Sequence, residues 1–155
     1  MSRRGTAVLG PVIVLLAAAS ASDVAAQSPA PLPPLPEVLV GTRWRLVEFR
    51  SSEDAIGTQR PSNPSLYTMS LEANGTVNLQ LDCNLATGTW TATTAGSSFG
   101  FGPLRMTRTV CQQPSLDAQI ARHTEYVSSF LVRDGLLYLN LTADGGTYVW
   151  EPLRE

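Results

Sequence analysis

The sequence predicts an α+β domain in which a curved antiparallel β-sheet of about seven strands wraps around one amphipathic helix. Two observations predict this class. Over most of the chain after residue 40, apolar and polar residues alternate with the period of two that is typical of half-buried strands. After Ser115 the apolar residues recur at spacings of three and four, as in an amphipathic helix, and the period of two then returns.

Residues 1–26 have the three zones of a secretory signal peptide: a basic start, an apolar run over 7–19 and an exit of small residues. We expect cleavage after Ala26, with Ala21 as a second site that fits the same rule. A membrane anchor is the alternative, but the run is shorter than the roughly 20 residues that span a bilayer, and Pro11 interrupts it. The mature chain is therefore expected in the periplasm or outside the cell.

A proline-rich segment, residues 27–39, follows the signal peptide. Its prolines fix φ and remove main-chain donors, so we expect a disordered, extended spacer. The first cysteine of the chain is Cys83, so no lipid-modified cysteine is expected to tether the mature chain to a membrane. The remaining residues, 40–155, are enough for one domain with a modest core.

The first three strands are predicted from alternation. Residues 43–50 place Trp44 and Phe49 on opposite faces of the first strand. Residues 67–71 and 77–81 alternate on either side of an Asn-Gly pair, which supplies the positive φ angles of a tight turn. These two segments are therefore expected to form a hairpin.

Four further strands complete the predicted sheet. Residues 87–93 are rich in β-branched threonine, and in residues 97–104 two phenylalanines alternate with glycines. After the helix, residues 136–141 are almost wholly apolar, and residues 148–150 follow an Asp-Gly-Gly turn. The last two segments are expected to pair as a hairpin.

The single helix is expected to run from Ser115 to about Arg133. Ser115 is suited to cap its start, Asp117 lies in the first turn where the helix dipole favours an acid, and Gly135 is suited to end it. The residues expected on its apolar side are Leu116, Ile120, His123, Val127, Phe130 and Leu131.

The two cysteines, Cys83 and Cys111, are the most chemically informative residues. An even number of cysteines in an exported chain favours a disulfide, which would stabilise the domain by roughly 3 kcal/mol through the unfolded state. Two buried free thiols are one alternative. A redox-active pair is another, although the C-x-x-C spacing typical of such pairs is missing.

Other candidate site residues are few. Four aromatic residues either line an apolar ligand pocket between sheet and helix or fill the core: Trp44, Phe99, Phe101 and Trp150. His123 is expected to be a partly buried, hydrogen-bonded histidine rather than a general base. One histidine and two distant cysteines do not make a metal site, and the chain has no glycine-rich phosphate loop, so we expect no cofactor.

The charge pattern gives no reason to expect nucleic acid as a partner. The formal net charge is −2, every basic residue is an arginine, and the arginines are scattered along the chain. A basic surface would have to be assembled by the fold.

Six short segments stand out by their order and spacing: Gly41-Thr42-Arg43-Trp44, Cys83-Asn84, Gly88-Thr89-Trp90, Phe101-Gly102-Pro103-Leu104, Thr107-Arg108 with Cys111, and Asp144-Gly145-Gly146. Together they resemble the META domain of bacterial secreted and envelope proteins. The resemblance implies a compact antiparallel sheet with a helix, an envelope location and a link to stress, including heat shock, or to motility. It marks Asn84, Gly88, Thr107 and Arg108 as family-motif residues. The chain departs from the family pattern at Asp82, where glycine is usual.

We therefore expect a non-enzymatic exported protein of the envelope or periplasm that acts through contacts with another envelope protein, in a response to stress. A binder of a small hydrophobic ligand, held between sheet and helix, is the alternative. The sequence identifies neither the partner nor the ligand.

Overall fold

The computed structural model describes residues 34–154. The predicted signal peptide and the first part of the predicted spacer lie outside the described residues. At the end of that spacer, Pro36 is buried and Leu39 is fully buried. The Leu39 amide also donates to the Pro36 carbonyl at 2.9 Å. Residues 36–39 are thus packed on the domain, which corrects the prediction that they belong to a disordered spacer.

The described residues form ten strands, one α-helix and four short 3₁₀ turns. The strands are β1 (Thr42–Arg50), β2 (Thr58–Gln59), β3 (Tyr67–Leu71), β4 (Thr76–Leu81), β5 (Asn84–Thr93), β6 (Ser98–Phe101), β7 (Arg105–Met106), β8 (Val127–Arg133), β9 (Leu136–Leu141) and β10 (Thr147–Pro152). The helix is α1 (Asp117–His123), and the 3₁₀ turns are η1 (Pro64–Leu66), η2 (Ala95–Ser97), η3 (Thr124–Tyr126) and η4 (Thr142–Asp144).

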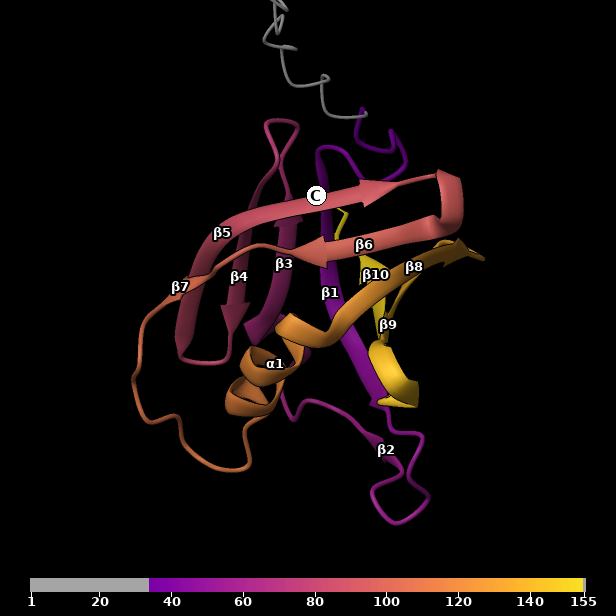
Figure 1. The fold of residues 1–155 in the computed structure, drawn as a ribbon. Helices are drawn as coiled ribbons and strands as arrows, with labels where there is room; N and C mark the ends of the chain where they lie inside the picture. The colour runs from indigo at the N-terminus through magenta and orange to yellow at the C-terminus, as the bar shows by residue number, and fades with distance from the viewer. Residues whose placement is uncertain (1–33, 155) are drawn as a thin grey trace, which may run out of the picture. The chain divides into compact units, whose positions relative to one another are not determined.

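Eight strands form one closed antiparallel sheet, in the order β1, β3, β4, β5, β6, β8, β9 and β10, with β10 pairing back onto β1. The short strands β2 and β7 are additions to β1 and β5 (Figure 1). The antiparallel class with one helix is confirmed, but the prediction of an open sheet of about seven strands is wrong. The sheet closes because β1 is long enough to pair with β3 through Thr42–Arg45 and with β10 from Trp44 to Arg50.

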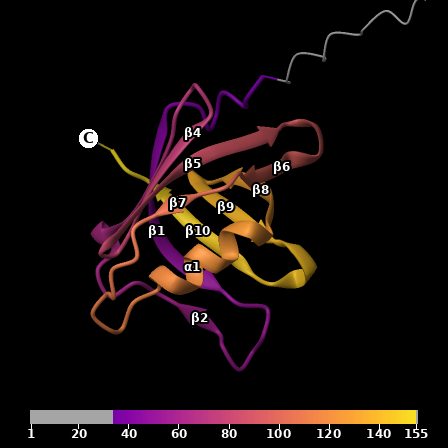
Figure 2. The ribbon, with the colours of Figure 1, turned by 60° about the vertical axis from the view of Figure 1, so that its left-hand side comes forward.

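The predicted helix is much shorter than expected. It ends at His123, η3 follows, and residues 127–133 are strand β8 (Figure 2). Val127 and Phe130 are both buried, three residues apart, because the pairing of β8 with β9 shifts register between Val127 and Ser129. A bulge in a strand therefore produced the spacing that we interpreted as helical.

A second bulge explains the error in the first strand. The pairing of β1 with β10 shifts register between Leu46 and Glu48. Trp44, Leu46 and Phe49 consequently all belong to the buried core, although the simple alternation placed Phe49 on the opposite face from Trp44. By contrast, the predicted hairpin over residues 67–81 is confirmed, with Tyr67 opposite Leu81 in the register.

Candidate binding groove

The Cys83–Cys111 disulfide fixes the middle of the loop that connects β7 to α1. The two cysteines are 28 residues apart in the sequence and form the predicted disulfide. Cys111 is buried, whereas Cys83 is exposed. Neither cysteine is free in this structure, so the alternative of two free thiols is not supported.

Asn84, next to the disulfide, is fully inside the protein and is the centre of a hydrogen-bond network. Its Oδ1 accepts from the Thr107 hydroxyl at 2.9 Å and from the Thr109 amide at 2.8 Å. Its Nδ2 donates to the Thr109 carbonyl at 2.9 Å and to Asp117 Oδ2 at 3.0 Å. One buried side chain therefore joins the start of β5, the loop after β7 and the first turn of α1.

The far end of the same loop is held by Tyr67 on β3. The Tyr67 hydroxyl accepts from the Leu116 amide at 3.0 Å and lies 3.1 Å from the Ser115 hydroxyl. Asp117 in turn accepts from the Ser115 hydroxyl at 3.0 Å. The start of the helix is thereby attached to the sheet at a defined position, although the helix begins at Asp117 rather than at Ser115.

Two glycines allow residues 102–104 to lie directly on β5. A Cβ on Gly88 would lie 2.6 Å from the Pro103 carbonyl oxygen, and a Cβ on Gly102 would lie 2.2 Å from Thr89 Oγ1. The register of β5 with β6 and that of β5 with β7 differ by one residue, so Pro103 and Leu104 together stand opposite Gly88. This is the geometry of a β-bulge, a position where a proline without an amide donor is tolerated.

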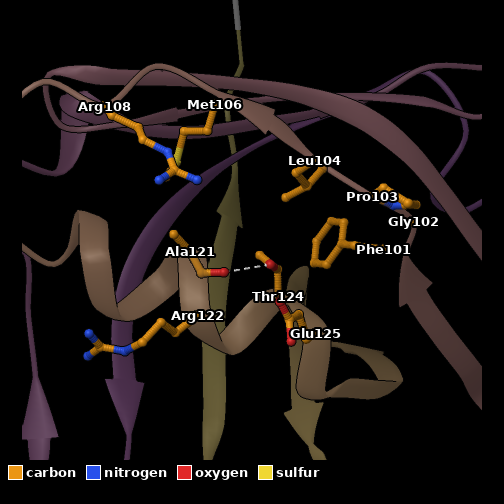
Figure 3. A pocket seen from close by; sticks show the side chains of 10 residues that line it. All are labelled: Phe101, Gly102, Pro103, Leu104, Met106, Arg108, Ala121, Arg122, Thr124 and Glu125. Atoms are coloured by element: carbon orange, nitrogen blue, oxygen red, sulfur yellow. Dashed lines mark hydrogen bonds between the residues drawn. The ribbon is translucent and has the colours of Figure 1, made fainter.

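A groove of about 670 Å³ lies between the segment 101–108 and the helical residues 121–125 (Figure 3). The first side is lined by Phe101, Leu104, Met106 and Arg108, among others. The second side is lined by Ala121, Arg122, Thr124 and Glu125. Figure 3 shows Met106 and Arg108 projecting from the strand side toward α1. The groove thus combines apolar side chains with three charged ones, Arg108, Arg122 and Glu125.

The charged residues of the groove are not engaged with one another. Arg108, Arg122 and Glu125 make no side-chain hydrogen bond or ion pair with any residue of the described range 34–154. Elsewhere on the domain arginines are paired: Arg45 lies 2.6 Å from Glu151, and Arg50 lies 2.6 Å from Glu48. Arg108 and Arg122, which have no internal partner within residues 34–154, can therefore bind a carboxylate from another molecule by donating hydrogen bonds to it.

The four predicted aromatic residues do not share a ligand pocket. Trp44, Phe99 and Trp150 are at most 4% exposed and belong to the core, whereas Phe101 is half-buried and lines the groove. The space between the sheet and α1, lined in part by Phe101 and Trp150, has a volume of only about 10 Å³. Ligand pockets are typically about 300–1,000 Å³, so the predicted ligand site between sheet and helix is too small as it stands.

His123, the last residue of α1, is half-buried against β10 and β1. Its Nδ1 lies 2.8 Å from the Tyr148 hydroxyl, and its ring centroid lies 5.3 Å from that of Phe49. Burial, and then the charge of Arg122, lowers the pKa of His123 below its usual value. Burial raises the pKa of Tyr148, so this pair is neutral at physiological pH. His123 is therefore the partly buried, hydrogen-bonded histidine that the sequence predicted.

Of the family-motif residues, three are structural: Asn84 and Thr107 belong to the network, and Gly88 receives the bulge. Arg108 lines the groove. Met106, Arg122 and Glu125 also line the groove and were not predicted as site residues. The only signal for them in the sequence was their closeness to Arg108 and His123.

Two further properties of the described part of the chain bear on the site. Among residues 34–154 no group of histidine, cysteine and acidic side chains is arranged to hold a metal ion. Within the same range, none of the helices has the length and apolar character needed to cross a membrane.

The fold and the groove define a small, disulfide-containing antiparallel domain with a solvent-facing groove. The chain belongs to the META domain family, whose model matches residues 37–152. The family resemblance carried by the motifs is thereby confirmed. No match was found among curated proteins.

Solved structures support the same fold. A protein from Burkholderia xenovorans, solved by NMR, superposes with a TM-score of 0.61 at 19% identity, covering 84% of this chain and 98% of that one. A DUF4847 family protein from Bacteroides vulgatus gives a TM-score of 0.57 at 12% identity, covering 77% and 97%. At these identities the likeness concerns the fold alone.

Proposed function

We propose that this protein is an exported, non-enzymatic binding protein of the bacterial envelope, and that it takes its partner in the groove between residues 101–108 and 121–125. One observation carries the proposal. The groove combines apolar side chains with Arg108 and Arg122, which have no internal ion pair within residues 34–154. Export is supported by the signal-peptide pattern and by the disulfide, which persists in oxidising compartments.

Binding rather than catalysis is supported by the surroundings of the lone histidine. His123 Nδ1 is occupied by the Tyr148 hydroxyl, whose raised pKa keeps it protonated. A nucleophile and base oriented by a carboxylate, as in hydrolases, is not formed at this residue. The link to stress is part of the proposal and rests on the family resemblance.

Export is tested by fractionation of a bacterial host that expresses the full sequence, followed by intact-mass measurement. We expect the chain in the periplasm or the medium, beginning at Gln27 and lighter by two hydrogens than the reduced form. A full-length chain retained in the cytoplasm would contradict the export part of the proposal.

The binding site is tested by placing a photo-crosslinking residue at Met106 in the groove and, as the matched control, at the exposed Thr58 on β2. In the native envelope we expect a discrete crosslinked product from position 106 and none from position 58. Equal crosslinking from both positions, or none from either, would remove the groove from the proposal.

A further inference from the structure

The groove lies where helical residues replace the strand that would otherwise pair with residues 102–108. Strands β6 and β8 are paired antiparallel at Ser98 and Ser129. Continuing this register would set Gly102 opposite Glu125 and Met106 opposite Ala121. In the structure those partner positions are not strand, because η3 and α1 occupy them. The groove is therefore at the position that a strand paired with residues 102–108 would occupy.

The segment 102–108 consequently has one paired and one unpaired edge. The Thr107 amide donates to the Leu85 carbonyl at 3.0 Å, so this residue faces β5. In an antiparallel ladder the next residue points its amide and carbonyl the other way, which directs those of Met106 away from β5. Within residues 34–154, no hydrogen bond reaches the main chain of Leu104 or Arg108. An unpaired strand edge is a template for another chain.

We propose that the groove binds an extended polypeptide segment, which adds as a strand to the free edge of residues 102–108 and carries a carboxylate at the Arg108 end. This inference rests on the proposed function and specifies its partner. Main-chain hydrogen bonds to the free edge provide affinity, as in other cases of strand addition. The edge is roughly 20 Å long at about 3.3 Å per residue, which accommodates a segment of about six residues.

The lining of the groove selects the sequence of that segment. Apolar side chains at alternate positions of the peptide contact Phe101, Leu104 and Met106, because successive side chains of a strand point to opposite faces. A carboxylate near Arg108, from an acidic side chain or a C-terminus, forms a charge-assisted pair with the free guanidinium. Arg122, which also lines the groove, adds a second positive charge.

The test separates main-chain pairing from the other contacts. The probe is an acetylated hexapeptide, Thr-Val-Thr-Val-Thr-Glu, titrated into the exported chain purified from the periplasm of an expressing host and followed by isothermal calorimetry. Two derivatives carry N-methyl groups, one on the odd and the other on the even residues. Alternate amides of an extended peptide point to opposite sides, so one derivative should bind at least tenfold more weakly while the other binds like the parent.

The charge contact is tested with two arginines on the same segment. Arg108→Gln should weaken the parent peptide about tenfold and remove most of its dependence on salt. Arg105→Gln is the matched control, because Arg105 is exposed beside Thr87 and does not line the groove, and we expect no change. Nuclear magnetic resonance spectra of both variants establish that they are folded.

Three results would overturn the inference. They are equal binding by the two N-methyl derivatives, no binding of the parent peptide, and binding of an anionic amphiphile such as laurate in place of the peptide. The last result, or a crosslink from position 106 to a partner when the peptide does not bind, would leave the groove as a site and remove only the strand addition. Absence of any crosslink from position 106 would instead contradict the proposed function itself.

Discussion

Two neighbouring regions differ in whether their polar groups have internal hydrogen-bond partners: the loop from Thr107 to Asp117 and the groove beside it. In the loop, Asn84 hydrogen-bonds to Thr107, Thr109 and Asp117, and the Cys83–Cys111 disulfide attaches the loop to the start of β5. On the groove side, Arg108 and its main chain have no partner within residues 34–154. Thr107 and Thr109 are thus paired internally while Arg108 between them is left for a partner, as expected where stability and binding are served by adjacent residues.

The largest effect is expected from removing the disulfide. The double variant Cys83→Ala, Cys111→Ala should lower the free energy of unfolding by about 3.5 kcal/mol, because the link closes a loop of 28 residues in the unfolded chain. Urea unfolding measures this, and the reduced wild-type protein should unfold with the variant. If stability were unchanged, the loop would be held by hydrogen bonds alone.

The next largest effect is expected at Asn84. Asn84→Ala should cost about 3 kcal/mol, since it leaves the Thr109 amide and carbonyl without their buried partner. Asn78→Ala on β4 is the control, because Asn78 is exposed, and a change within about 0.5 kcal/mol is expected there. A loss of stability of similar size in both variants would show that the network adds nothing particular to the loop.

The contact that shapes the groove is tested at Gly88. A methyl group at this position would meet the Pro103 carbonyl oxygen at 2.6 Å, so Gly88→Ala should cost about 2 kcal/mol and displace the strand side of the groove. Gly100→Ala on β6 is matched to it, because the nearest atom to a Cβ there is 3.9 Å away. Thermal unfolding of the two variants compares them, and equal melting temperatures would contradict the bulge as a tight contact.

Strand alternation, bulges and closure of the sheet decide how much of the fold could be predicted from the sequence. The hairpin of β3 and β4 was predicted correctly, because its strands alternate without interruption around an Asn-Gly turn. Strand β8 was predicted as helix, because the bulge after Val127 turns a period of two into a spacing of three between Val127 and Phe130. Closure of the sheet depends on β1 pairing at both of its edges, which is a long-range property that local periodicity does not encode.

The candidate site was less predictable than the fold. Asn84 was found because a family motif contains it, and the disulfide because an even number of cysteines in an exported chain favours one; the structure gives their physical role. The groove was not found, because it arises from residues 101–108 and 121–125 meeting after a strand is replaced by a helix. Of the two alternatives predicted for Phe99 and Trp150, a ligand pocket or the core, the structure supports the core, as is usual for large aromatic residues.

The smallest expected effect is a change in the pKa of the single histidine, His123, when the charge of Arg122 is removed. Burial first, and then the charge of Arg122, lowers the pKa of His123. Arg122→Gln should therefore raise that pKa without restoring it to the usual 6.5, as measured by NMR titration of the single imidazole. Arg154→Gln, a change of the same charge at an exposed residue that does not line the groove, should leave it unchanged.

The lowered pKa of His123 also determines how the contribution of this residue to stability changes with pH. Because the folded-state pKa of His123 lies below the unfolded value of 6.5, the unfolded chain binds more protons between the two values. The contribution of this residue to stability is thus complete above pH 6.5 and decreases as the pH falls toward the folded pKa. Arg122→Gln should narrow the pH range between the folded and unfolded pKa values, because it raises the folded-state pKa. A carboxylate bound beside Arg122 should do the same. The His123 titration therefore measures whether the groove is occupied. An unchanged titration on saturation with the acidic peptide would place its carboxylate away from Arg122.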